Sequence, residues 1–141
     1  QRQALNCASD DLAEAARLLR ALGGRAWIRA VTIPGPPRPK MRPRFTKTGH
    51  AFVPREERKA VAATRAFLAE QGFACDSNPL AVAFLFFRSN ARQADTDNFC
   101  KYALDAGQGL LWRNDAQVSA LSAVVHLDRQ APRTVIGWAR R

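Results

Sequence analysis

Cysteine and histidine are scarce in this sequence, with three cysteines and two histidines among 141 residues. The cysteines, Cys7, Cys75 and Cys100, lie far apart and have no clustered histidines beside them. An odd number of scattered cysteines indicates neither a disulfide framework nor a zinc site. We expect Cys100, which falls inside a predicted helix, to be a packed thiol rather than a nucleophile.

Long apolar runs are also missing. No stretch approaches the roughly 18 to 20 apolar residues of a membrane-spanning helix, and no positively charged start precedes an apolar segment as in a signal peptide. We expect a soluble, cytoplasmic protein that has no membrane partner. Hydrophobic residues make up 47% of the chain, which is enough to bury the core of one domain.

Acidic residues are in the minority, because 12 Asp and Glu stand against 22 Lys and Arg and leave a formal net charge of +10. Residues 25–65 hold eleven basic and two acidic residues, a net charge of +9. Such a concentrated positive field attracts polyanions, and nucleic acid is the commonest polyanion for a basic protein. A solvated charged surface is the alternative explanation.

The apolar pattern predicts an α/β fold of the α+β type, a single small domain with a mixed sheet flanked by helices and a C-terminal β-hairpin. The predicted helices cover residues 10–22, 54–71 and 97–106, and the predicted strands cover residues 26–33, 80–87, 118–127 and 134–138. In the first helix, Asp11 and Glu14 have the spacing of a capping box. We expect a structural role for His126 and a core position for Trp112.

Residues 34–52 form a proline-rich basic segment, with five of the eight prolines between Pro34 and Pro43. So many prolines exclude a helix or a central strand. A basic segment stiffened by proline loses little entropy on binding and suits phosphate contacts, although a loop charged for solubility has the same composition. We predict DNA contacts from this segment and from the outer face of the next helix. The predicted DNA-binding residues are Arg38, Lys40, Arg42, Arg44, Lys47, Arg55, Arg58 and Lys59.

A cluster of acidic residues follows the apolar run LAVAFLFF, in the stretch QADTDNFCKYALD. Asp97, Lys101 and Asp105 are spaced by four residues and share one face of the predicted helix, while Asp95 lies just before it. One interpretation is structural: Asp97 caps the helix, Lys101 pairs with Asp97 and Asp105, and Asp95 is solvated.

The other interpretation is a metal site. Two carboxylates in an Asp-x-Asp motif after a buried strand can reach one hard cation such as Mg²⁺, which prefers one or two carboxylates together with waters and phosphate oxygens. Asp115, in a polar turn before the strand 118–127, is a third carboxylate that we expect at the same edge of the sheet. A bound cation would reverse the sign of the patch, admit a phosphodiester and activate water for attack on phosphorus.

Two motifs in series resemble those of the RusA-type endodeoxyribonucleases, which resolve Holliday junctions. The first, Asp95-Thr96-Asp97-Asn98-Phe99-Cys100-Lys101, matches the pattern D-x-D-N-x-x-K. The second, Trp112-Arg113-Asn114-Asp115-Ala116-Gln117, matches W-x-D-D-x-Q, except that Asn114 replaces the first acidic residue with a side chain that offers a carbonyl oxygen but no charge. The similarity runs from about Trp27 to Trp138 and includes the basic segment.

The resemblance implies a homodimer that cuts four-way DNA junctions with Mg²⁺ or Mn²⁺ and acts in DNA recombination and repair. Asp95, Asp97 and Asp115 would be the metal-binding carboxylates and Lys101 the essential lysine. It also divides the chain into an N-terminal helical extension, residues 1–24, and a RusA-like nuclease domain, residues 25–141. Two alternatives stay open: a non-catalytic protein that binds junction or duplex DNA, and a nuclease for other branched DNA.

Overall fold

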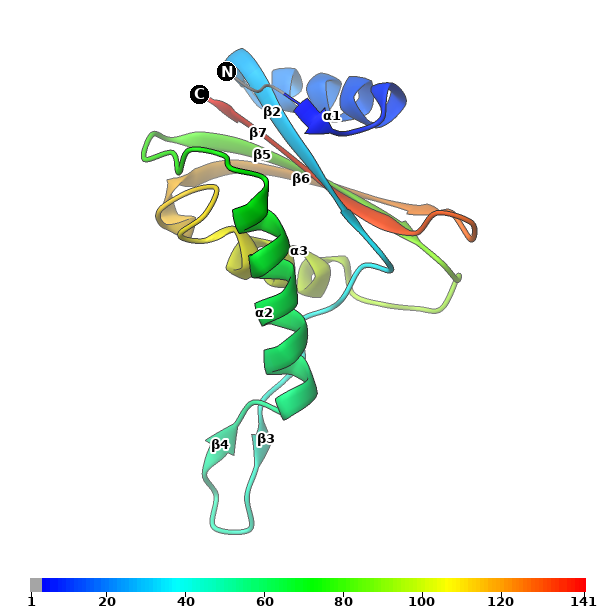
Figure 1. Cartoon of the computed structure of the whole chain (residues 1–141), viewed down its shortest axis with the longest axis vertical. Coiled ribbons are helices and arrows are strands. Elements are labelled where there is room, and N and C mark those ends of the chain that lie inside the picture. Colours follow the sequence, from blue (N-terminus) through cyan, green and yellow to red (C-terminus); the bar gives the residue numbers. More distant parts are fainter. Residues whose placement is uncertain (1–3) are drawn as a thin grey trace.

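A computed structural model of the chain describes residues 4–141 and contains one mixed sheet with the strand order β1-β2-β7-β5-β6 (Figure 1). These strands are β1 (Ala4–Asn6), β2 (Arg25–Pro34), β5 (Leu80–Arg88), β6 (Val118–Leu127) and β7 (Arg133–Arg140). β5 runs parallel to β6, whereas β7 runs antiparallel to both β2 and β5. Residues 1–3 of the predicted N-terminal extension lie outside the described part of the chain.

Three helices cover the two faces of the sheet (Figure 1). They are α1 (Ser9–Ala21), α2 (Arg55–Glu70) and α3 (Thr96–Gly107). Phe84, Phe86 and Trp138 of the sheet belong to the main core with Phe99 of α3, and Leu19 of α1 packs against the opposite face. β5 is buried along nearly its whole length because both faces are covered, and this explains why its sequence is continuously apolar. The predicted α+β class is confirmed.

The last two strands are consecutive and run antiparallel, as predicted for a C-terminal hairpin, but β5 lies between them. The prediction of a direct ladder between β6 and β7 was therefore wrong. A strand that is apolar on both faces belongs in the middle of a sheet, and β5 takes that place by pairing with β6 on one side and β7 on the other. β6 becomes an edge strand as a result.

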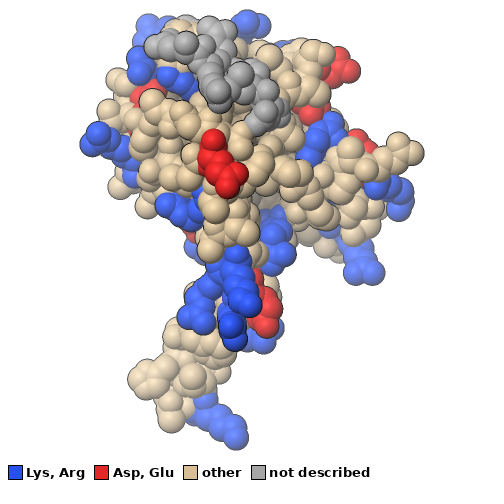
Figure 2. All heavy atoms as spheres, in the orientation of Figure 1, with Lys and Arg blue, Asp and Glu red and all other residues tan. Residues whose placement is uncertain are grey.

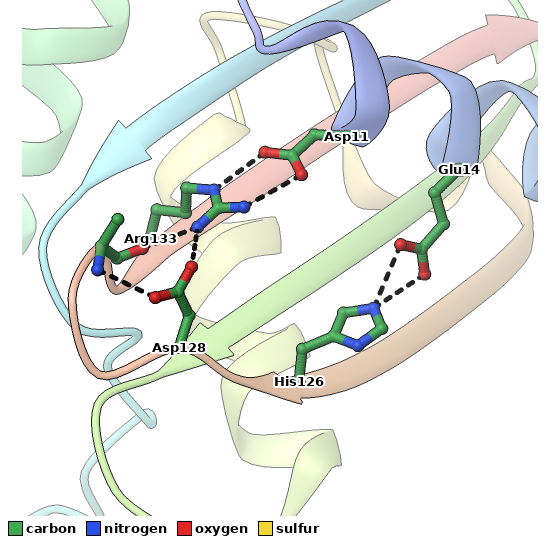
Figure 3. A network of polar contacts seen from close by, with 6 residues as sticks. Asp11, Glu14, His126, Asp128 and Arg133 are labelled. Atoms are coloured by element: carbon green, nitrogen blue, oxygen red, sulfur yellow. Dashed lines mark hydrogen bonds and ion pairs between the residues drawn. The ribbon is translucent and has the colours of Figure 1, made fainter.

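The helix α1 is fastened to the sheet by two polar contacts (Figure 3). Arg133 of β7 donates hydrogen bonds to both carboxylate oxygens of Asp11, at 2.8 and 3.0 Å, and one of 2.8 Å to Asp128. The hydrogen bond to Asp11 is the main reason that the pKa of Arg133 is raised above its ordinary value. His126 lies 2.8 Å from Glu14, so the expected structural role of this histidine is confirmed.

The predicted capping box of α1 is not formed. The N-cap residue is Ala8, which has no side-chain cap, and the two carboxylates of the motif bind Arg133 and His126 instead. Both carboxylates stabilise the helix through tertiary contacts, because a partner from the sheet competes successfully with the local backbone N–H groups.

The proline-rich segment extends away from the sheet beside the start of α2 and ends in a small hairpin (Figure 1). Its two strands, β3 (Arg44–Phe45) and β4 (Ala51–Phe52), pair antiparallel and were not predicted from the sequence. No helix within residues 4–141 is long and apolar enough to cross a membrane.

Candidate active site

The acidic cluster lies where β5 leaves the sheet and α3 begins. Asp95 is the N-cap residue of α3 and Asp97 lies in its first turn, so both carboxylates are held at the N-terminal end of a helix that packs on the sheet. Both residues are exposed to solvent. The buried Phe99, which packs against Phe86 at a ring separation of 5.3 Å, fixes the first turn of the helix to the strand. The position of the two carboxylates is therefore determined by core packing.

The carboxylates share a surface hollow with the basic segment. Its lining residues are Lys40, Met41, Arg42, Pro43, Asp95, Asp97, Asn98 and Lys101. The segment is held there by the backbone N–H of Lys40, which donates to the carbonyl of Asn98 at 3.0 Å, and by an ion pair of 2.5 Å between Lys40 and Asp105. The two regions that the sequence singled out are thus adjacent, and Asn98 and Met41 are lining residues that were not predicted.

Within the described part of the chain, the side chains of Asp95, Asp97 and Lys101 form no hydrogen bond or ion pair. Asp95 makes no side-chain cap, and within residues 4–141 neither aspartate accepts a hydrogen bond through its carboxylate and Lys101 forms no ion pair. Asp105 binds Lys40 instead of Lys101. Of the structural interpretation, the cap by Asp97 and the pairs of Lys101 with Asp97 and Asp105 are not formed, whereas Asp95 is exposed to solvent as that interpretation expected.

Asp115 lies at the other end of α3. It opens a short 3₁₀ turn, Asp115–Gln117, where its backbone N–H donates to the side chain of Gln108 at 3.3 Å, just after the last residue of α3. At about 1.5 Å per residue, Asp97 and Gln108 are roughly 16 Å apart along the helix axis. In residues 4–141, no three Asp, Glu, His or Cys side chains lie close enough to hold one metal ion.

The direction of β6 explains why Asp115 lies far from Asp95 and Asp97. β6 is parallel to β5, so Val118 at the start of β6 pairs with Leu80 at the start of β5, whereas Asp95 follows the end of β5. The expectation that Asp115 lies at the same edge of the sheet as Asp95 and Asp97 is therefore not met within one chain.

The second motif, residues 112–117, forms and stabilises the turn before β6. The Trp112 indole is fully buried, as predicted, and its N–H donates to Asp115 at 3.1 Å. Asn114 accepts a hydrogen bond from the backbone N–H of Ala116 at 2.9 Å, and Gln117 donates to the carbonyls of Asp76 and Asn78. Asn114 therefore acts as a cap, which an uncharged side chain can do as well as an aspartate.

The predicted DNA-binding residues are all exposed and follow the basic segment onto the start of α2. Figure 2 shows Lys and Arg side chains gathered where this projection leaves the body of the protein. Lys40 and Arg42 reach the hollow, and Arg38 lies 3.5 Å from Glu57. Arg65, on the same helix, faces inward and donates to carbonyls at the end of α3, including that of Gln108 at 2.6 Å.

Comparison with protein families matches residues 34–137 to the model of endodeoxyribonuclease RusA. The chain belongs to the RusA family. The matched region covers the basic segment, both motifs, the strands β3 to β6 and the first part of β7. Membership assigns the chain, in general terms, to the endonucleases that act on Holliday junctions. A search of the curated proteins gave no match.

Proposed function

We propose that the protein is a Mg²⁺-dependent endodeoxyribonuclease, for which Mn²⁺ can substitute, and that it resolves four-way junctions by paired phosphodiester hydrolysis. The observation that carries this proposal is that the carboxylates of Asp95 and Asp97 have no hydrogen-bond or ion-pair partner among residues 4–141 and lie beside Lys101 and the basic segment in a single hollow. Unpaired carboxylates in a strongly basic protein repel DNA phosphate unless a cation joins them.

The donor set fits Mg²⁺. Two carboxylates at one site, with room left for waters and a phosphate oxygen, match the coordination that this ion prefers. A bound divalent cation would supply Lewis acidity toward the scissile phosphate and toward the attacking water. Lys101 offsets charge that develops on the phosphoryl oxygens, while Lys40 and Arg42 hold the DNA backbone across the hollow.

A homodimer would complete the site. β6 is an edge strand of ten residues that contains no charged residue and no proline. Its exposed apolar side chains, Leu121, Val125 and Leu127, lie on one face. Charged residues and prolines on an edge strand normally prevent pairing with other chains, and β6 has neither. A long apolar edge of this kind can pair with another strand. The partner that we propose is β6 of a second copy, paired antiparallel about a twofold axis near Ser122.

This arrangement would bring Asp115 to the other carboxylates. In an antiparallel pair, the start of one β6 lies beside the end of the other, and the end of β6 aligns with the end of β5 through the pair Arg88 and Leu127. Asp115 of one chain would then lie at the edge of the sheet that carries Asp95 and Asp97 of its partner. Both copies contribute to each site, so cleavage would require the dimer.

The test is cleavage of a synthetic mobile four-way junction, compared with a flap and a linear duplex, in Mg²⁺ and in EDTA. We expect symmetric nicks on opposing strands of the junction, with 5′-phosphate and 3′-hydroxyl ends, in Mg²⁺ only. Faster cleavage of the flap would identify a nuclease for other branched DNA. Junction binding without cleavage in Mg²⁺ or Mn²⁺ would contradict the proposed activity.

A further inference from the structure

We infer that the β3–β4 hairpin is a reader of branched DNA, in which the ring of Phe45 stacks on a base left unstacked at the branch point. This inference rests on the proposed function and concerns how the same enzyme would distinguish a junction from a duplex. It assigns a specificity role to a residue outside the hollow that holds Asp95 and Asp97.

The first observation is the exposure of the ring. Phe45 is 70% exposed, more than any other large hydrophobic side chain described, although it lies in a strand whose hydrogen bonds fix its direction. Its cross-strand neighbour is Ala51, whose methyl group is too small to cover it. Phe52 pairs with Arg44 and therefore lies on the other face of the hairpin. One face of the hairpin thus presents a bare aromatic ring.

The second observation is that backbone hydrogen bonds order the hairpin that carries the ring. The turn between the strands is closed by two backbone hydrogen bonds, from Thr46 to His50 at 2.9 Å and from Gly49 to Thr46 at 3.0 Å. Gly49 has a φ of +86°, a conformation that other residues rarely adopt. The root of the segment is tied to α3 through Lys40. A backbone ordered in this way loses little conformational entropy when the ring binds.

The positive charge around Phe45 favours DNA as the partner that binds the ring. Residues 34–54 contain five lysines and arginines and no acidic residue. Aromatic side chains in a cationic setting bind nucleic acid by stacking on base faces. Insertion between stacked base pairs costs a few kcal/mol per step, so a base face that is already free is the favoured partner. A duplex offers no free base face, whereas the branch point of a junction does. The ring would therefore add affinity for branched DNA alone.

The hairpin also reaches away from the catalytic hollow, so the two contacts can be separated by mutation. Lys40 and Arg42 line the hollow, and the hairpin begins two residues later at Arg44 and projects beyond the body of the protein (Figure 1). A DNA strand held at the hollow would continue along the basic segment toward Phe45. The branch point would lie at the hairpin, and the scissile phosphate at the carboxylates.

The experiment measures equilibrium binding of the full-length chain to an immobile four-way junction and to a duplex of the same sequence, in EDTA. A 2-aminopurine base at the branch point reports stacking by its fluorescence. Phe45→Ala should weaken junction binding about 5- to 100-fold and leave duplex binding nearly unchanged. Phe45→Trp should retain tight binding and the fluorescence change, whereas Phe45→Leu, which keeps apolar area without a π face, should behave like Phe45→Ala.

Phe52→Ala is the matched control, because it removes the same ring from the opposite face of the hairpin and should leave the preference for the junction intact. Equal loss of junction and duplex binding in Phe45→Ala would overturn the inference, as would junction binding by Phe45→Leu with the affinity of the wild type. A shift of Phe45→Ala from dimer to monomer in sedimentation would show that the hairpin binds a second copy instead. Binding in EDTA needs no cleavage, so a wild type that selects junctions but never cuts them would contradict only the proposed function.

Discussion

Asp97→Asn is expected to lower the rate of junction cleavage on the order of a thousandfold while junction affinity changes little. The substitution keeps the size and hydrogen-bonding capacity of the side chain but removes the charge that a divalent cation needs. Because the carboxylate has no partner among the described residues, the variant should fold as the wild type does. The measurement is single-turnover cleavage of a four-way junction in Mg²⁺, with a gel-shift assay of the same protein.

Asp105→Asn is the control for this experiment. Asp105 belongs to the same helix, is also exposed and is also acidic, but its partner is Lys40. We expect at most a severalfold effect, caused by a less firmly held basic segment, since exposed ion pairs contribute little. Cleavage by Asp97→Asn at the wild-type rate would exclude Asp97 as a metal ligand, and an equal loss in Asp105→Asn would show that the effect is not specific to Asp97.

Asp76→Ala is expected to lower the free energy of unfolding by about 3 kcal/mol. The carboxylate of Asp76 is almost completely buried and lies 3.0 Å from Arg140 and 3.6 Å from Arg29. It also accepts hydrogen bonds of 2.9 and 2.8 Å from the backbone and side chain of Asn78. Its removal leaves the largely buried side chain of Arg29 without this counter-charge, and a buried charge that loses its partner is costly.

The loss should depend on pH. Burial by itself raises the pKa of Asp76, but the hydrogen bonds from Asn78 and Arg140 outweigh it and hold the pKa below its usual value. A lowered pKa contributes stability above the unfolded value of about 3.9, and this contribution disappears as the pH falls. Urea unfolding of wild type and variant should therefore differ most near neutral pH and converge in acid. Asp10→Ala, an exposed aspartate, should stay within about 0.5 kcal/mol of wild type throughout.

Most of the elements could be predicted from the sequence because their patterns are local. The predicted limits of α1, β5, α3 and β6 agree with the structure to within about one residue, since each has a strong apolar period or a clear stop. The β3–β4 hairpin could not be predicted, because strands of two exposed residues have no alternation of apolar and polar positions. The place of β5 between β6 and β7 depended on pairing, which local pattern does not encode.

The candidate site also contains residues whose positions follow from local spacing and one whose position depends on strand pairing. The structure places Asp95, Asp97 and Lys101 in one hollow because they follow one strand and begin one helix, where spacing determines geometry. Their role in metal binding and catalysis stays a prediction. Asp115 comes from another element, and its position depends on whether β6 runs parallel to β5. Asp11 and Glu14 show the same limit: their spacing suits a capping box, but their partners, Arg133 and His126, come from strands more than a hundred residues away.

Subunit complementation tests the central claim most directly, which is that two chains build each metal site. Asp97→Asn and Asp115→Asn chains are mixed under conditions that exchange subunits, and junction nicking is measured in Mg²⁺. Each variant alone should be inactive. In a mixed dimer, one site receives both substitutions and the other receives neither, so the mixture should recover about a quarter of the wild-type nicking rate. No recovery, with subunit exchange confirmed by tagged chains, would show that the shared site does not exist.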